Sequence, residues 1–180
     1  YDMWNGYYTW ISNVNYILAE EETMSGSETE KNYVLGQAYA VRAYSYFMLA
    51  QMFSRTYKGH ESEPCVPLYT EPTDIATEGK GRATVEEVYQ QITSDLDKAI
   101  TMLGNSGKRK HISHINEAVA SGIKARVALV MEDWQTALDA ANAAISKSGC
   151  SIGTGTAVTG GMNHATANLS LIHIYEHTRL

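Results

Sequence analysis

The strongest constraint on the fold is a stripe of apolar side chains that recurs with helical spacing between residues 85 and 103. Thr84, with Glu87 three positions later, forms a capping-box pattern where the stripe begins, and Gly104 supplies a stop where it ends. The stripe consists of Val85, Val88, Tyr89, Ile92, Leu96, Ala99, Ile100 and Leu103. Burying these side chains contributes about 15 kcal/mol, whereas ordering the segment costs about 20 to 40 kcal/mol. This helix therefore requires neighbours of the same kind.

Two further helices are expected in the first third of the chain. Apolar residues recur at helical spacing over residues 3–22. A second capping box, Ser27 with Glu30, precedes a run over 32–53 that is apolar on nearly every side. The second helix is therefore expected to be largely buried.

The last two helical segments, 115–131 and 134–148, are separated only by the turn Glu132-Asp133, in which Asp133 can cap the second helix. Small residues stand where two antiparallel helices would face each other: Ala118, Ala125, Ala128, Ala137, Ala141 and Ala144. The second helix is expected to pack through a stripe that also contains Trp134, Leu138 and Ile145. This hairpin resembles a degenerate tetratricopeptide unit, although no strict period of about 34 residues is present. The predicted fold class is all-α, built from tetratricopeptide-like helical hairpins.

A long connection over residues 54–83 separates the second and third helices. It holds all three prolines of the chain, Pro64, Pro67 and Pro72. Connections of this length are usually functional or lie along a larger body that fixes them. This Pro-containing loop is therefore expected either to be functional or to lie along a larger body that fixes it.

Composition excludes several classes of function. The chain has 14 Lys and Arg against 20 Asp and Glu, a net charge of -6, so no nucleic-acid partner is expected. No nucleophile motif, phosphate-binding glycine loop or zinc-ligand run is present. Cys65 and Cys150 match neither a metal-ligand spacing nor a disulfide framework, and His111 and His114 fit a polar loop better than a metal site. We therefore predict a protein that is not an enzyme, with no catalytic residue, no metal and no cofactor.

Some polar residues fall on or beside apolar stripes. Asn15 and Arg42 are interpreted as structural groups that need hydrogen-bond partners if buried, rather than as ligand contacts. Asp95 and Asp97 are interpreted as the solvated face of the third helix. The chain has twelve tyrosines against two phenylalanines, and tyrosine suits either stacking on sugar rings or half-buried helix packing. Packing is favoured for the four tyrosines of the second helix, Tyr33, Tyr39, Tyr44 and Tyr46.

Five segments of the chain, in this order and spacing, resemble one known family. They are Trp4-x-x-x-Tyr8-x-x-Ile11 with Asn15-x-Ile17-Leu18, GQAYAVRAYSYFMLAQMF over 36–53, Val66-Pro67-Leu68, RATVEEVYQQITSDLDKAITML over 82–103, and ASGIKARVALVMEDWQTALDAANAAI over 120–145. Together they resemble the N-terminal helical part of SusD/RagB-type proteins. The resemblance implies an outer-membrane nutrient-binding lipoprotein built as a SusD-like superhelix of helical hairpins.

This resemblance also implies a function and partners. Such a protein captures glycan at the cell surface without breaking a bond and delivers it to a TonB-dependent, SusC-like barrel in the outer membrane. It touches the membrane only through a lipid anchor, whose cysteine would lie before Tyr1. No ligand-binding residue is carried over, since the family's glycan contacts are expected outside this segment. The alternative function is an intracellular tetratricopeptide-like adaptor that binds peptides or proteins.

Domain organisation follows from the same reading. Residues 1–168 are expected to be the N-terminal part of a SusD-like domain, incomplete at both ends. Residues 169–180 resemble translated linker sequence from a sequencing library and are not expected to contribute to function.

Overall fold

A computed structural model describes residues 2–150, which form five helices and one small antiparallel sheet. The elements are α1 (Asp2–Ala19), α2 (Glu28–Phe53), β1 (Pro64–Pro67), β2 (Arg82–Thr84), α3 (Val85–Gly104), α4 (Glu117–Val130) and α5 (Trp134–Ser148). The all-α prediction is confirmed. The expected tail at 169–180 lies outside the described residues.

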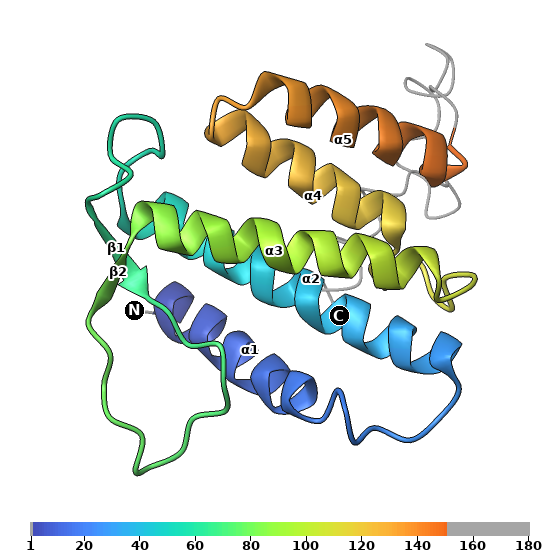
Figure 1. The fold of residues 1–180 in the computed structure, drawn as a ribbon, viewed down its shortest axis with the longest axis horizontal. Helices are drawn as coiled ribbons and strands as arrows, with labels where there is room; N and C mark the ends of the chain where they lie inside the picture. Colours follow the sequence, from blue (N-terminus) through green and yellow to red (C-terminus); the bar gives the residue numbers. More distant parts are fainter. Residues whose placement is uncertain (1, 151–180) are drawn as a thin grey trace.

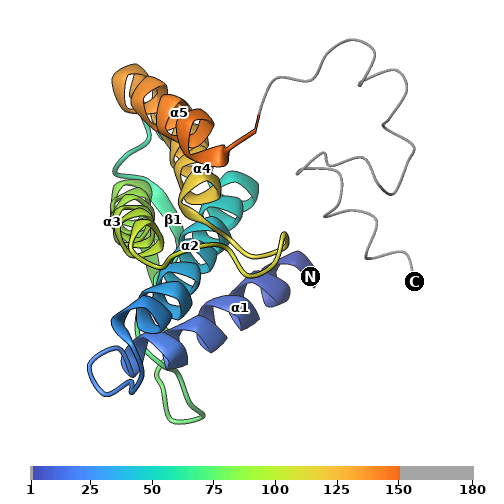
Figure 2. The ribbon, with the colours of Figure 1, turned by 90° about the vertical axis from the view of Figure 1, so that its right-hand side faces the viewer.

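The long helix α2 lies in the middle of the bundle (Figure 1). It packs against α1 on one side and α3 on the other. The helices α4 and α5 form a hairpin in which α4 packs mainly on α3 and to a small extent on α2, and α5 packs on α4. Figure 2 shows the α4–α5 pair above the layer formed by α1, α2 and α3. Because α2 has neighbours on several sides, its nearly uniform apolar character is explained by burial rather than by one amphipathic face.

Hydrogen bonds at the predicted caps set where α2 and α3 begin. The Ser27 hydroxyl accepts a hydrogen bond from the Glu30 amide, and the Glu30 carboxylate accepts one from the Ser27 amide. At α3, the Thr84 amide donates to Glu87 Oε2 at 2.7 Å, and the Glu87 amide donates to Thr84 Oγ1 at 3.2 Å. Both capping boxes predicted from the sequence are confirmed.

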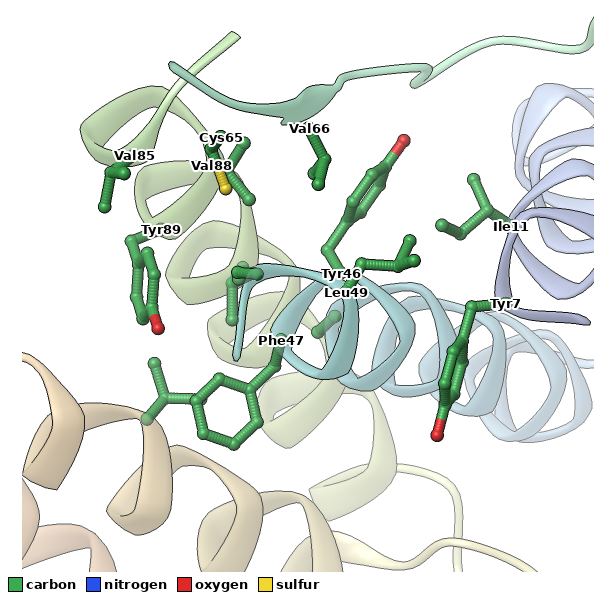
Figure 3. Close-up of a cluster of buried hydrophobic side chains, with 14 of the residues drawn as sticks. Tyr7, Ile11, Tyr46, Phe47, Leu49, Cys65, Val66, Val85, Val88 and Tyr89 are labelled. Carbon is green, nitrogen blue, oxygen red and sulfur yellow. The ribbon is translucent and has the colours of Figure 1, made fainter. Parts of the chain in front are cut away.

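The stripe on α3 forms the core with α2, as Figure 3 shows. In that view Tyr46, Phe47 and Leu49 of α2 lie between Tyr7 and Ile11 of α1 on one side and the side chains of α3 on the other. Every member of the predicted α3 stripe except Ile100, which is half-buried, is buried.

At Gly36, α2 lies very near the end of α3. A Cβ placed on Gly36 would lie 2.8 Å from Leu103 Cγ and 3.2 Å from the Leu103 amide nitrogen. Real Cβ atoms do not approach other atoms so closely, so only glycine allows α2 to lie this near the end of α3.

The connection between α2 and α3 contains two short strands that the sequence did not predict. Strand β1 pairs with β2 in antiparallel fashion, with an irregular register between Pro64 and Pro67. Neither proline has a backbone N–H to donate to a ladder, and a four-residue run with two prolines does not indicate a strand from sequence. The Arg82 guanidinium supplies donors instead, to the carbonyls of Cys65 at 2.5 Å and Pro64 at 3.0 Å.

The α4–α5 hairpin is only partly as predicted. Its facing alanines at 118, 125, 128 and 137 are buried, and a left-handed Glu132 with φ of 60° makes the two-residue turn. However, Trp134, Leu138 and Ile145 are 64%, 56% and 68% exposed, so the predicted packing stripe of α5 is wrong at its large members. The two helices approach through their alanine faces, which turns the large side chains away from α4.

Candidate functional site

A buried ion pair joins α2 to α3 at the centre of the bundle. Arg42 is 5% exposed, and its Nε and Nη2 donate to Asp95 Oδ2 at 2.7 Å and Oδ1 at 2.8 Å. This is the bidentate geometry in which a guanidinium holds a carboxylate most strongly. The interpretation of Asp95 as a solvated residue is wrong, because this side chain is fully buried. Its spacing of three from Ile92 and four from Ala99 places it on the apolar stripe, which was the available signal.

Asn15 extends this ion pair to α1 and to the long connection. Arg42 Nη1 donates to Asn15 Oδ1 at 2.9 Å and to the Thr70 carbonyl at 3.1 Å. Asn15 Nδ2 in turn donates to the carbonyls of Tyr69 at 3.0 Å and Glu71 at 3.1 Å. Asn15 and Arg42 thus have the hydrogen-bond partners that the structural interpretation requires. We call Arg42, Asp95 and Asn15 the buried polar network.

The ion pair keeps Arg42 charged despite its burial. Desolvation lowers the pKa of Arg42, but the hydrogen bonds and the negative charge of Asp95 more than offset this effect and leave the pKa raised. Gln91 Nε2 donates a further hydrogen bond to Asp95 Oδ1 at 2.8 Å. The network therefore has partners for its charged groups, which a buried ion pair requires to be stable.

Tyrosine hydroxyls from α1 and α2 hydrogen-bond to the same connection. The Tyr46 hydroxyl donates to the Tyr69 carbonyl at 2.7 Å and accepts from the Tyr69 amide at 2.7 Å. The Tyr8 hydroxyl donates to the Pro67 carbonyl at 2.7 Å. Burial raises the pKa values of Tyr8 and Tyr46, so both phenols stay protonated as donors at neutral pH. The tyrosines thus serve packing, as predicted, and also hold the backbone of residues 67–71.

Where this connection passes α1, the two segments enclose a hollow of about 190 Å³, which we call the polar cavity. One wall comes from α1 and the other from the connection, drawn in green in Figure 1. The cavity is lined by Tyr8, Ile11, Ser12, Asn15, Tyr69, Thr73, Asp74 and Thr77. Hydroxyl, carboxylate and aromatic groups together are the chemistry with which proteins hold small polar ligands.

A second, larger hollow of about 950 Å³ lies between α1, α2, α4 and α5, and we call it the apolar groove. Its lining includes Trp10, Val14, Val41, Tyr44, Ile115, Val119, Ile123 and Ile145. Few of its side chains could pair with the many hydroxyls of a sugar, and unpaired polar groups are costly to bury. The groove is therefore suited to an apolar helix face rather than to a glycan.

The histidines and cysteines named in the sequence analysis are not among the residues that line either hollow. His114 Nδ1 is hydrogen-bonded to the Tyr33 hydroxyl, and His111 Nδ1 contacts the Ser113 hydroxyl at 2.7 Å. Within residues 2–150, no three potential metal-ligating side chains are grouped closely enough to hold an ion. Cys65 is buried and Cys150 exposed, and neither is in a disulfide. None of the helices described for this chain has the length and apolar character that a membrane span requires.

Helical hairpins packed around a central α2, with a long connection fixed to them by a buried polar network, define a tetratricopeptide-like helical scaffold. The chain belongs to the SusD-like family. The family model described as starch-binding associating with outer membrane matches residues 1–129.

Solved structures support the same assignment. The chain is similar to a SusD-like carbohydrate binding protein from Bacteroides vulgatus, with 29% identity, a TM-score of 0.76, and coverage of 83% of this chain and 32% of that one. A putative sugar binding protein from Bacteroides vulgatus gives 31% identity, a TM-score of 0.74, and coverage of 80% and 32%. A laminarin binding SusD-like protein gives 25% identity, a TM-score of 0.60, and coverage of 77% of this chain and 28% of that one. The chain thus spans about a third of the length of these structures. No curated protein matches the chain.

Proposed function

We propose that this chain is part of a non-catalytic protein that captures glycans at the surface of an outer membrane. The observation that carries the proposal is the match of residues 1–129 to a family described as starch-binding and associated with the outer membrane. Similar structures that are named as carbohydrate-binding and laminarin-binding proteins support it. The net charge of -6 fits a neutral ligand better than a polyanion.

The architecture supports capture rather than catalysis. The conspicuous ionisable pair in the bundle, Arg42 with Asp95, is fully engaged in holding the connection against α1 and α2. A carboxylate committed in this way is a poor general acid or base, because both of its oxygens already accept hydrogen bonds from Arg42. What the network supplies instead is a rigid wall beside the polar cavity.

Glycan binding is tested by titrating the 180-residue chain, and a longer polypeptide that contains it, with maltoheptaose and laminarihexaose. These neutral glucans represent the ligands named for the family and for one similar structure. The proposal predicts saturable binding of at least one neutral glycan by the longer polypeptide on a wider glycan array. Absence of binding across that array would contradict it.

We also propose that the protein delivers its glycan to a SusC-like TonB-dependent barrel and is attached to the membrane by a lipid anchor. Both rest on the family resemblance. They predict that the complete gene encodes a signal peptide ending in a lipid-accepting cysteine, and that the mature protein co-purifies with a large barrel from outer-membrane extracts. Recovery of the protein only from the soluble cell fraction would contradict both.

One observation favours a second candidate, an intracellular adaptor that binds peptides. The apolar groove has a volume of about 950 Å³ and an apolar lining against which the apolar face of a helix can pack. The family match to proteins associated with the outer membrane weighs against this candidate. Cell fractionation separates the two functions, since an adaptor would reside in the cytoplasm.

A further inference from the structure

We propose that the polar cavity between α1 and the long connection is a subsite that holds a single sugar ring of the captured glycan. This inference rests on the proposed function and names a place for one ring within the described residues. The cavity of about 190 Å³ corresponds to about six water molecules at roughly 30 Å³ each, which limits it to one small ring rather than a chain.

Three polar groups around the cavity are available to a ligand. The side-chain hydroxyls of Ser12 and Thr73 make no hydrogen bond to any residue in the range 2–150. Asp74 Oδ1 accepts from the Ala76 amide at 3.0 Å and from the Thr77 hydroxyl at 2.9 Å, which leaves Oδ2 without a partner in that same range. Two hydroxyls and one carboxylate oxygen around a small hollow match the alternating donors and acceptors of a sugar ring.

The cavity is also shaped before any ligand arrives. Asn15 in its wall holds the carbonyls of Tyr69 and Glu71 and is itself held by Arg42. The Tyr16 hydroxyl donates to the Thr73 carbonyl at 2.8 Å, which fixes the far side of the connection. Because these bonds are made within the protein, little ordering cost remains for binding.

Aromatic surface is present as well. The rings of Tyr8 and Tyr69 meet edge to face, with centroids 6.2 Å apart and an interplanar angle of 84°. Together with Ile11 they give the cavity an apolar side against which the C–H face of a sugar can pack. A hollow with one aromatic side and three free polar groups discriminates a sugar from a purely apolar ligand.

The charge of the site favours a neutral sugar. Hydrogen bonds from Thr77 and Ala76 lower the pKa of Asp74, so its carboxylate is ionised and accepts hydrogen bonds at neutral pH. On the same connection, the Lys80 ammonium donates to the Leu68 carbonyl at 3.3 Å and lies over the Tyr69 ring. An acidic sugar would therefore meet a carboxylate, whereas a neutral hydroxyl would find an acceptor.

The test uses the full 180-residue chain with Ser12→Ala and Asp74→Asn as variants. Ser12→Ala removes a hydroxyl from a helix, where alanine is well tolerated. Asp74→Asn keeps an oxygen for the turn to Thr77 and replaces the free carboxylate oxygen with an amide donor. Asp97→Asn is the matched control, because Asp97 is an exposed acid on α3 outside the cavity lining.

Binding of maltoheptaose and laminarihexaose is measured by isothermal titration calorimetry, and urea midpoints establish that each variant is folded. We expect Asp74→Asn to raise the dissociation constant about tenfold or more and Ser12→Ala to raise it about two- to tenfold. The difference arises because hydrogen bonds to charged groups contribute more to binding than hydrogen bonds to neutral groups. The control should bind as the unaltered chain does. Saturation-transfer NMR should also show one ring of the glycan in closer contact than the others.

Two outcomes overturn the subsite. If the unaltered chain binds glycan and the folded variants bind equally well, the polar cavity is not used, while the proposed function stands. If the unaltered chain binds neither glucan, the subsite is also overturned, because all of its residues lie in this chain. The proposed function is then decided separately by the glycan array on the longer polypeptide.

Discussion

Replacing Asp95 with alanine tests whether the buried polar network holds the bundle together. The substitution removes both hydrogen-bond acceptors of Arg42 on α3 and leaves a guanidinium that is 5% exposed without its counter-charge. Hydrogen bonds to charged groups contribute about 1.5 to 3 kcal/mol each, and breaking a buried ion pair costs about 3 to 5 kcal/mol. We therefore expect Asp95→Ala to lower the free energy of unfolding by about 3 to 5 kcal/mol.

The assay is urea unfolding of the 180-residue chain, followed by far-ultraviolet circular dichroism and tryptophan fluorescence. Asp97→Ala is the control, since Asp97 pairs with Lys124 at the surface and exposed pairs contribute about 1 kcal/mol or less. A variant with Arg42→Met and Asp95→Leu together should recover part of the loss, but Asn15 Oδ1 and the Thr70 carbonyl would still lack their donor.

The reasoning is refuted if Asp95→Ala unfolds within about 1 kcal/mol of the unaltered chain. Such a result would mean that water or a shifted side chain replaces the carboxylate. It would also remove the basis for a preorganised wall at the polar cavity.

Three further results are expected. Hydrogen bonds from Thr84 lower the pKa of the Glu87 carboxylate below 4.5, so the stabilisation that they give above that pH is lost as the pH falls through the lowered pKa. The urea midpoint should therefore fall under acid conditions, and it should fall less in Glu87→Gln. A midpoint that does not fall, or an equal fall in the variant, would contradict this. Gly36→Ala should destabilise by about 1 to 3 kcal/mol, whereas Gly6→Ala, with no atom within 4 Å, should stabilise by up to about 1 kcal/mol; equal midpoints would argue against close helix packing. The chain should bind a hydrophobic dye, less so with Val119→Lys in the apolar groove than with Leu138→Lys outside it; a dye-silent unaltered chain would oppose this.

The helices could be predicted because periodicity and capping are local signals. The stripe that begins after Thr84 and the box at Ser27 each fix where a helix begins, and both depend only on residues a few positions apart. Arg42 was also recognisable as a structural residue, since a charge on an apolar stripe must find a partner.

Features that depend on distant segments could not be predicted in the same way. The spacing of Asp95 from the apolar stripe of α3 hints at its burial, but the partner that makes this burial possible, Arg42, lies on a different helix. The strands β1 and β2 are short, β1 begins and ends with a proline, and β2 pairs with β1 from about seventeen positions away, where Arg82 also meets the Cys65 carbonyl. The exposure of Trp134 depends on which face of α5 meets α4. The sequence does not determine this face, because α5 carries small residues on several sides.

The polar cavity illustrates the same limit for the candidate site. Ser12 lies on a helix and Asp74 in an irregular segment, and neither belongs to a recognisable sugar-binding motif. The link between them is the bond from Asn15 to the carbonyls of the connection. Sequence could predict that Asn15 needs partners but not which backbone groups would supply them.

The central claim is that the protein holds a glycan without transforming it. The most direct measurement incubates the longer polypeptide with a glycan that it binds, separates the complex, and determines the mass of the recovered glycan by mass spectrometry. The account predicts saturable binding and full recovery of the original mass. Recovery of shorter saccharides, in amounts that grow with time and protein concentration, would contradict it.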